Sequence, residues 1–372
     1  MAKRENLKNF SIKSYLEHSK KDIKEKIKKN PINYLKIINS SKKGQKNRFK
    51  DIFKNLNNFI DKKNIIEKKE KIYVYQQSNR KKTYTGIICG VSTNDYKNKK
   101  IKIHEKTIEK RENLFKDYLK ICKIHAEPVL LTHKENQQIN KFIQNKIKQI
   151  PLIKFTTNDK KIHSIWEIST KKEIKETKEY FKKINLYIAD GHHRMSSSLL
   201  YNEENNLNNQ CLAYIISKNQ LKLESFHRIV SNVTIEQKKE LLKFLEKEFT
   251  LKTGKENISI KKNKINIYLN QKWHNITLKY TSKKIAVQTL SDDILKPFFK
   301  IKDIRKSKQI KFIPDSKFKL YEIAKKNNII FCLPEIKMDD IFRTSDKDQT
   351  MPPKSTYIRP KLRTGLIMMK LK

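Results

Sequence analysis

Strand-like and helix-like segments alternate along the whole of this 372-residue chain, and this alternation is what most limits the folds open to it. Residues 211–217 (CLAYIIS) form a short apolar run typical of a strand. Residues 234–249 (TIEQKKELLKFLEKEF) have the apolar spacing of an amphipathic helix that opens with a capping box. No internal repeat or low-complexity linker interrupts the alternation. The sequence therefore predicts a mixed α/β (α+β) fold, as one large body that can divide into two lobes.

The N-terminal part differs from the rest of the chain. Residues 1–70 are polar and helical in pattern, whereas residues 71–372 carry strand and helix patterns together with all of the motifs described below. We therefore expect a helical N-terminal region over 1–70 and a mixed α/β body over 71–372.

Several absences indicate the cellular compartment. No run of about 18 apolar residues occurs, and no apolar segment follows the basic N-terminus, so we expect neither a membrane span nor a secretory signal. The four cysteines are widely separated and form no CxxC pair, which argues against a disulfide framework or a cysteine zinc site. A cytoplasmic protein with no membrane partner is expected.

The net charge of +46 has two explanations. A basic surface neutralises phosphates, so the charge is compatible with a non-enzymatic nucleic-acid-binding protein. However, only 10 of the 85 basic residues are arginine, and lysine is spread along the whole chain. This is the composition expected from an AT-rich genome, and we favour that explanation. Weak, non-specific binding to polyanions is expected in either case.

The stretch YIADGHHR (187–194) predicts a strand, an Asp-Gly turn and the start of a helix. Backbone N–H groups and the helix dipole make such a helix start favourable for phosphate. Gly191 allows close approach of the backbone, and His192, His193 and Arg194 can donate to phosphate oxygens. The alternative is an ordinary turn in which Asp190 caps the helix. The His-His-Arg sequence favours the phosphate site.

Two shorter motifs carry candidate catalytic and binding residues. KIHEKT contains His104 and Glu105, a pair in which Glu105 can act as a general base for a hydroxyl proton. SFHRIV contributes Arg228 as a candidate for binding substrate. Exposed His-Glu pairs are common, so this signal is weak when taken alone.

The C-terminal stretch MPPKSTYIRPKLRTGL (351–366) combines a proline-stiffened loop with many groups that bind anions. Lys354, Ser355 and Thr356 follow the prolines, and Lys361 and Arg363 would share one face if this part is a strand. Such a loop suits a phosphate or carboxylate ligand. The alternative is a basic edge strand that is protected against aggregation.

A transition-metal site is a weaker hypothesis. Adjacent histidines on a helix point about 100° apart, so His192 and His193 seldom bind one ion, and no HExxH motif occurs. A Mg²⁺ ion that arrives with a phosphate and contacts Asp190 is favoured instead. No tightly bound organic cofactor is expected.

YIADGHHR, KIHEKTIEKRE, AEPVLLTH and MPPKSTYIRPKLRTGL resemble the signatures of the bacterial and archaeal family called domain of unknown function 1015. The resemblance runs in consistent order from about residue 15 to the C-terminus. The N-terminal arm of the family, which ends in Pro-Tyr-Asp, is expected to be shortened here near IKSYLEHS (12–19). The DGHHR turn also resembles the phosphate-handling turn of the ParB/sulfiredoxin superfamily, which includes free serine kinases.

This resemblance implies a ParB/sulfiredoxin-like core and a small-molecule phosphotransferase that acts on free serine or, in reverse, on phosphoserine. The donor would be ADP, pyrophosphate or ATP, and no Walker A motif is present to select a nucleoside triphosphate. By the same resemblance, the residues from Asp190 to Arg194 would hold the donor diphosphate with Mg²⁺, and Glu105 would be the base. Separately from the resemblance, we take Lys354 and Arg363 as candidates for binding the substrate carboxylate or phosphate. A nucleic-acid-binding protein is the second hypothesis and a metal-dependent hydrolase the third.

Overall fold

The computed structural model describes residues 10–13, 19–68, 71–254, 263–278, 284–324 and 327–371. The chain forms two compact units. The first unit consists of Met1–Ile103, Thr107–Leu221 and Pro360–Lys372, and the second consists of His104–Lys106 and Lys222–Arg359. Both contain helices and sheets, so the predicted mixed α/β fold is confirmed. The arm expected near 12–19 falls largely on residues 14–18, which lie outside the described residues.

An eight-stranded mixed sheet forms the centre of the first unit, in the order β3-β8-β5-β9-β2-β1-β7-β6. Its strands are β1 (Ile72–Ser78), β2 (Thr83–Ser92), β3 (Ile101–Lys102), β5 (Val129–His133), β6 (Ile153–Thr156), β7 (Ile162–Ile168), β8 (Leu186–Asp190) and β9 (Gln210–Ser217). Strands β5 and β9 pair in parallel, and all or nearly all of their residues are buried. A strand that is buried on both faces needs apolar side chains throughout, which explains the continuous apolar run at 211–217.

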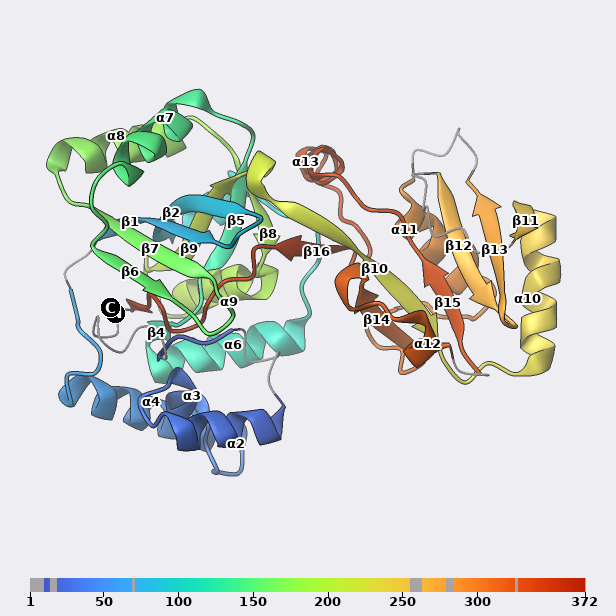
Figure 1. The fold of residues 1–372 in the computed structure, drawn as a ribbon, viewed down its shortest axis with the longest axis horizontal. Helices are drawn as coiled ribbons and strands as arrows, with labels where there is room; N and C mark the ends of the chain where they lie inside the picture. Colours follow the sequence, from blue (N-terminus) through green and yellow to red (C-terminus); the bar gives the residue numbers. More distant parts are fainter. Residues whose placement is uncertain are drawn as a thin grey trace. The chain divides into compact units, whose positions relative to one another are not determined.

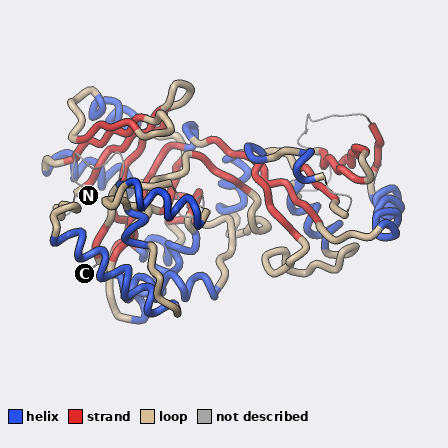
Figure 2. The backbone as a smooth tube through the Cα atoms, turned by 60° about the horizontal axis from the view of Figure 1, so that its bottom comes forward, coloured by secondary structure: helices blue, strands red, loops and turns tan. Residues whose placement is uncertain are grey.

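Helices surround this sheet in both views (Figure 1 and Figure 2). Side chains from α7 and α8 pack against β1 and β7, whereas Met195 of α9 packs against β5, β8 and β9. The helices of the unit are α2 (Lys20–Lys29), α3 (Tyr34–Ile38), α4 (Gln45–Asp61), α5 (Thr93–Lys97), α6 (Glu109–Cys122), α7 (Gln137–Ile147), α8 (Lys171–Lys182) and α9 (His192–Glu204). A short pair, β4 (Ile124–His125) with β17 (Met369–Lys370), joins the C-terminus to this unit.

The second unit has a separate sheet whose described strand pairs are antiparallel, in the order β11-β13-β12-β15-β10-β14, with β16 also paired to β10. Ile229, Trp273, Ile330 and Cys332 form its core. Its elements are β10 (Lys222–Val230), α10 (Ile235–Glu248), β11 (Thr250–Gly254), β12 (Lys264–Leu269), β13 (Lys272–Thr277), α11 (Ala286–Thr289), β14 (Ile310–Pro314), α12 (Leu320–Ile323), β15 (Ile329–Cys332), α13 (Met338–Asp346) and β16 (Thr356–Arg359). No helix among the described residues of either unit is long and apolar enough to span a membrane.

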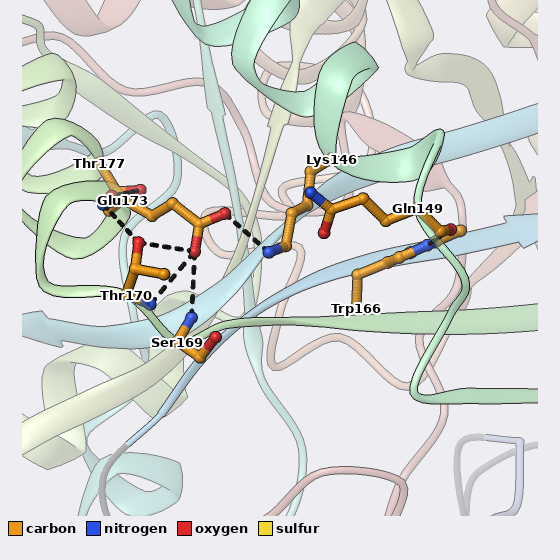
Figure 3. Close-up of polar contacts among 7 residues, drawn as sticks. All are labelled: Lys146, Gln149, Trp166, Ser169, Thr170, Glu173 and Thr177. Atoms are coloured by element: carbon orange, nitrogen blue, oxygen red, sulfur yellow. Dashed lines mark hydrogen bonds and ion pairs between the residues drawn. The ribbon is translucent and has the colours of Figure 1, made fainter.

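A partly buried ion pair joins α7 to α8 in the first unit (Figure 3). The Nζ atom of Lys146 lies 2.7 Å from Oε1 of Glu173, and the two side chains are 8% and 20% exposed. The other oxygen of Glu173 accepts the backbone N–H groups of Ser169 and Thr170 at 3.3 and 3.2 Å, as part of the capping box that begins α8. Glu173 therefore holds the first turn of α8 and the end of α7 together.

We expect Glu173→Gln to lower the free energy of unfolding by about 1–3 kcal/mol at neutral pH, because it removes charge-assisted hydrogen bonds. Desolvation by burial raises the pKa of Glu173, but hydrogen bonds from Lys146 and Thr170 outweigh it, so the pKa lies below its ordinary value of 4.5. A lowered pKa stabilises the fold above the unfolded-state pKa, and this contribution is lost as the pH falls through the folded-state value. The difference between wild type and variant should therefore shrink below about pH 4.5 in urea unfolding curves.

The matched control is Glu179→Gln on the same helix. Glu179 is 49% exposed and lies 4.0 Å from Lys182, so its loss should change the stability by less than about 0.5 kcal/mol. Equal effects of the two substitutions would show that the Lys146–Glu173 pair does not join the helices.

Candidate functional site

The predicted phosphate-binding turn lies at a corner between β8 and α9 in the first unit. Strand β8 ends at Asp190, and Gly191 is the N-cap residue of α9, with φ of +99° and ψ of 29°. The alternative in which Asp190 occupies the N-cap position is wrong. Because glycine has no side chain, the N-cap residue itself cannot cover the first N–H groups of the helix, and these are the groups that bind phosphate in such turns.

Asp190 forms an ion pair with Lys361, a residue of the C-terminal motif. Lys361 Nζ lies 2.8 Å from Asp190 Oδ2, and the two side chains are 26% and 42% exposed. The pair brings an ammonium group to the corner that carries the helix N-terminus. This contact joins two of the predicted site residues across 171 positions of sequence.

Arg194 connects three of the motifs noted in the sequence. Its Nη1 donates to the carbonyl oxygen of Pro128 at 2.7 Å and lies 2.8 Å from Glu127 Oε1. The hydroxyl of Thr364 donates to the other oxygen of Glu127 at 2.8 Å. Nη1 of Arg194 is thus used within the protein, and its predicted phosphate contact rests on Nε and Nη2.

Gly191 packs directly against the Arg194 guanidinium. A Cβ atom at position 191 would lie 2.9 Å from Nη2 of Arg194, closer than such contacts allow. The φ of +99° also lies outside the region that other residues adopt readily. We expect Gly191→Ala to lower the free energy of unfolding by about 1–2 kcal/mol, measured by urea denaturation.

Gly254→Ala is the control for this substitution, because nothing lies within 4 Å of the position that its Cβ would take. We expect it to change the stability by less than about 0.5 kcal/mol. A Gly191→Ala protein as stable as the Gly254→Ala protein would contradict a requirement for glycine at the turn.

The two histidines of the turn occupy different surroundings. Nε2 of His193 accepts the backbone N–H of Ile108, the N-cap residue of α6, at 3.0 Å. The proton of the neutral ring is therefore assigned to Nδ1. His192 is buried, with 7% of its surface exposed. Their donation to phosphate stays a prediction.

Arg363 contacts the N-terminal segment of the first unit. Its Nε donates to the hydroxyl of Ser11 at 2.7 Å, and its Nη2 donates to the carbonyl oxygen of Ser11. Desolvation by burial lowers the pKa of the Arg363 guanidinium, against the opposing charges of Tyr75 and Asp159. Residues 361–363 are not in a strand, so Lys361 and Arg363 do not share the face that a strand would give them. The substrate role of Arg363 stays a prediction.

Arg228 is completely buried in the second unit and supports the loop that begins the C-terminal motif. Its Nη1 donates to the carbonyl oxygen of Phe226 at 2.7 Å, and its Nη2 donates to that of Lys354 at 2.9 Å. The guanidinium also lies 4.7 Å from the ring centroid of Phe312. Burial lowers the pKa of Arg228 to about 9, while the charge of Glu105 acts in the opposite direction. In this structure Arg228 positions the loop, and its contact with substrate stays a prediction.

The loop itself is held by local hydrogen bonds. Lys354 has a positive φ of 56°, and the hydroxyl of Ser355 donates to the carbonyl oxygen of Pro352. Thr356 begins β16 and pairs with Ser225 of β10. The ammonium group of Lys354 lies 5.9 Å from the ring centroid of Phe226. The loop is therefore a defined structure, as the two prolines indicated.

The His104-Glu105 pair belongs to the same unit as this loop. The backbone N–H of Met351 donates to the carbonyl oxygen of His104 at 2.7 Å, and His104 is 2% exposed. The hydrogen bond with Asp303 raises the pKa of Arg305, and the charge of Glu105 acts in the same direction. The charge of Glu105 also opposes the larger effect of burial, which lowers the pKa of Arg228. Sequence analysis missed Arg305. Its one signal was that arginine is rare in this chain.

The predicted site residues thus fall into two groups. The first unit holds the Asp190–Arg194 turn with Lys361 and Arg363, and the second holds His104, Glu105, Arg228 and the 354–356 loop. Within the parts of the chain that the structure describes, no three His, Cys, Asp or Glu side chains form a group that could hold a metal ion. The hypothesis of a metal-dependent hydrolase therefore gains no support from the described residues.

Comparison with known proteins identifies a family and distant structural likenesses. The model of the family described as protein of unknown function (DUF1015) matches residues 1–295. No curated protein matches the chain.

Among solved structures, a C-terminally truncated SbnI from Staphylococcus aureus is 12% identical with a TM-score of 0.44, over 74% of this chain and 84% of that one. A mutant free serine kinase in complex with ADP is 12% identical with a TM-score of 0.43, over 79% of this chain and 94% of that one. A free serine kinase in complex with AMP is 13% identical with a TM-score of 0.40, over 82% of this chain and 94% of that one.

Proposed function

The chain belongs to the DUF1015 family, and we propose that it is a small-molecule phosphotransferase. It transfers a phosphoryl group between a diphosphate donor and the hydroxyl group of free serine. The donor is ADP, pyrophosphate or ATP, and the reverse reaction consumes phosphoserine.

One observation carries this proposal. Gly191 in a left-handed conformation begins α9 at the end of β8, and the Asp190–Lys361 pair lies at the same corner. A helix N-terminus attracts phosphate through its N–H groups and dipole, and the ammonium group of Lys361 brings further N–H donors to the same corner. Phosphoryl transfer depends mainly on positioning and charge neutralisation, which these groups supply.

Asp190 suits a Mg²⁺ ion that accompanies the donor. Mg²⁺ prefers one or two carboxylate oxygens together with phosphate oxygens and water, and the Asp190 side chain is 42% exposed at the end of its strand. The bound ion would neutralise charge on the donor phosphates.

The reaction is a displacement at phosphorus. Glu105 takes the proton from the serine hydroxyl group, the serine oxygen forms a bond to the terminal phosphorus of the donor, and the bond to the leaving phosphate oxygen breaks. With ADP the products are phosphoserine and AMP. With pyrophosphate they are phosphoserine and phosphate, and with ATP they are phosphoserine and ADP. Lys354 and Arg363 are the candidates for binding the substrate carboxylate or phosphate.

Phosphorus NMR tests this function directly. The purified full-length chain is incubated with Mg²⁺, L-serine and, in separate samples, ADP, pyrophosphate or ATP. The expected result is a phosphoserine resonance with at least one donor. Absence of the resonance in every sample, together with unreactive phosphoserine in the reverse direction, would rule out the serine reaction and favour the nucleic-acid-binding hypothesis.

A further inference from the structure

A largely apolar cavity of about 180 Å³ lies in the first unit beside the Arg194–Glu127 ion pair. Tyr34 and Phe115 line its apolar wall, and Glu127 and Arg194 line its polar end. We propose that this cavity binds a small monocyclic aromatic carboxylate. The ring would fill the apolar part, and the carboxylate would pair with the guanidinium of Arg194.

The size and the walls of the cavity fit one ring. An apolar cavity of about 150 Å³ binds benzene, so this volume has room for a six-membered ring with a short substituent. Three aromatic side chains, those of Tyr34, Phe115 and Tyr118, line it. Aromatic rings pack favourably edge to face or offset against one another.

The charges around the cavity favour an anion over a cation. Both oxygens of Glu127 already accept hydrogen bonds, from Arg194 and from Thr364. Arg194 uses Nη1 for its contacts with the described residues, so a carboxylate would pair with Nε and Nη2, the donors also predicted for the phosphate, and the two ligands would compete for them. Desolvation by burial lowers the pKa of His125 to about 4, so this cavity residue is neutral at pH 7. The net charge of +46 attracts anions at long range.

Isothermal titration calorimetry of the full-length chain with three probes tests the inference. Phenylacetate carries both the ring and the carboxylate, acetate lacks the ring, and 2-phenylethylamine has the ring with the opposite charge. We expect saturable binding of phenylacetate, and affinities at least about tenfold weaker for the other two. No saturable binding of phenylacetate, or equal binding of the amine, would overturn the inference.

A pair of neighbouring substitutions locates the bound probe. Leu114 and Phe115 on α6 are each 37% exposed, but only Phe115 lines this cavity. We expect Phe115→Ala to weaken phenylacetate binding about tenfold, and Leu114→Ala to leave it unchanged. Equal effects of the two variants would place the probe elsewhere and overturn the assignment. The measurement is of binding alone, so its outcome is independent of whether the protein transfers phosphate.

Discussion

Asp190→Ala is expected to slow phosphoserine formation by about 10²–10⁴-fold. The substitution removes the carboxylate that pairs with Lys361 at 2.8 Å and that would contact the Mg²⁺ ion of the donor. It also leaves the ammonium group of Lys361 without this partner at the phosphate site. Initial rates from phosphorus NMR, with the donor on which the wild-type protein acts, measure the effect.

Two further variants separate a role in the reaction from a role in folding. Asp190→Asn keeps the shape of the side chain and removes its charge. Its reaction rate should fall nearly as far as that of Asp190→Ala, while its urea unfolding midpoint should equal that of the wild-type protein. The control is Glu203→Gln, which changes an acidic residue at the opposite end of α9 from the turn. There Glu203 pairs with Lys97 on the surface. This control should keep the rate within about twofold. A rate in Asp190→Asn as high as in Glu203→Gln would remove Asp190 from the mechanism.

Arg228→Ala is expected to lower the free energy of unfolding of the second unit by about 3–5 kcal/mol. Arg228 is 0% exposed, and its loss removes the guanidinium that donates to the carbonyl oxygens of Phe226 and Lys354. The substitution also leaves a cavity beside Phe312, whose ring now contacts the guanidinium. Lysine at this position should rescue little, since its N–H groups share one nitrogen atom and lack the fixed, planar fork of a guanidinium.

Tryptophan fluorescence can follow the second unit by itself. The chain has two tryptophans, Trp166 in the first unit and Trp273 in the second. In a Trp166→Phe background, urea unfolding reported by Trp273 therefore gives the stability of the second unit. Arg305→Ala is the matched control, because this arginine is 32% exposed and pairs with Asp303 only two residues away. Its loss should change the stability by less than about 1 kcal/mol. Equal losses for the two arginines would show that Arg228 does not hold the loop.

The sequence predicted those features that depend on near neighbours. The capping box at Thr234 and Gln237, the helix that follows it and the strand at 211–217 are confirmed. The strand, turn and helix around Gly191 are confirmed as well. Each of these depends on residues within a few positions of one another, where apolar period and capping chemistry act directly. One local detail was less certain, since glycine and aspartate both suit an N-cap, and the structure has Gly191 there.

The contacts that build the candidate site were decided only by the tertiary structure. Lys361 meets Asp190 across 171 residues, Arg194 meets Pro128 across 66, and Arg228 meets Lys354 across 126. Sequence analysis selected most of these residues because their types bind anions, but it assigned Arg194 and Arg228 to ligands rather than to the protein. The spacing of residue types along the chain predicts only those contacts that form within one helical turn or one strand. A buried guanidinium has lost its contacts with water and therefore needs acceptors within the protein. The packing of sheets and helices decides which distant carbonyl or carboxylate groups become these acceptors.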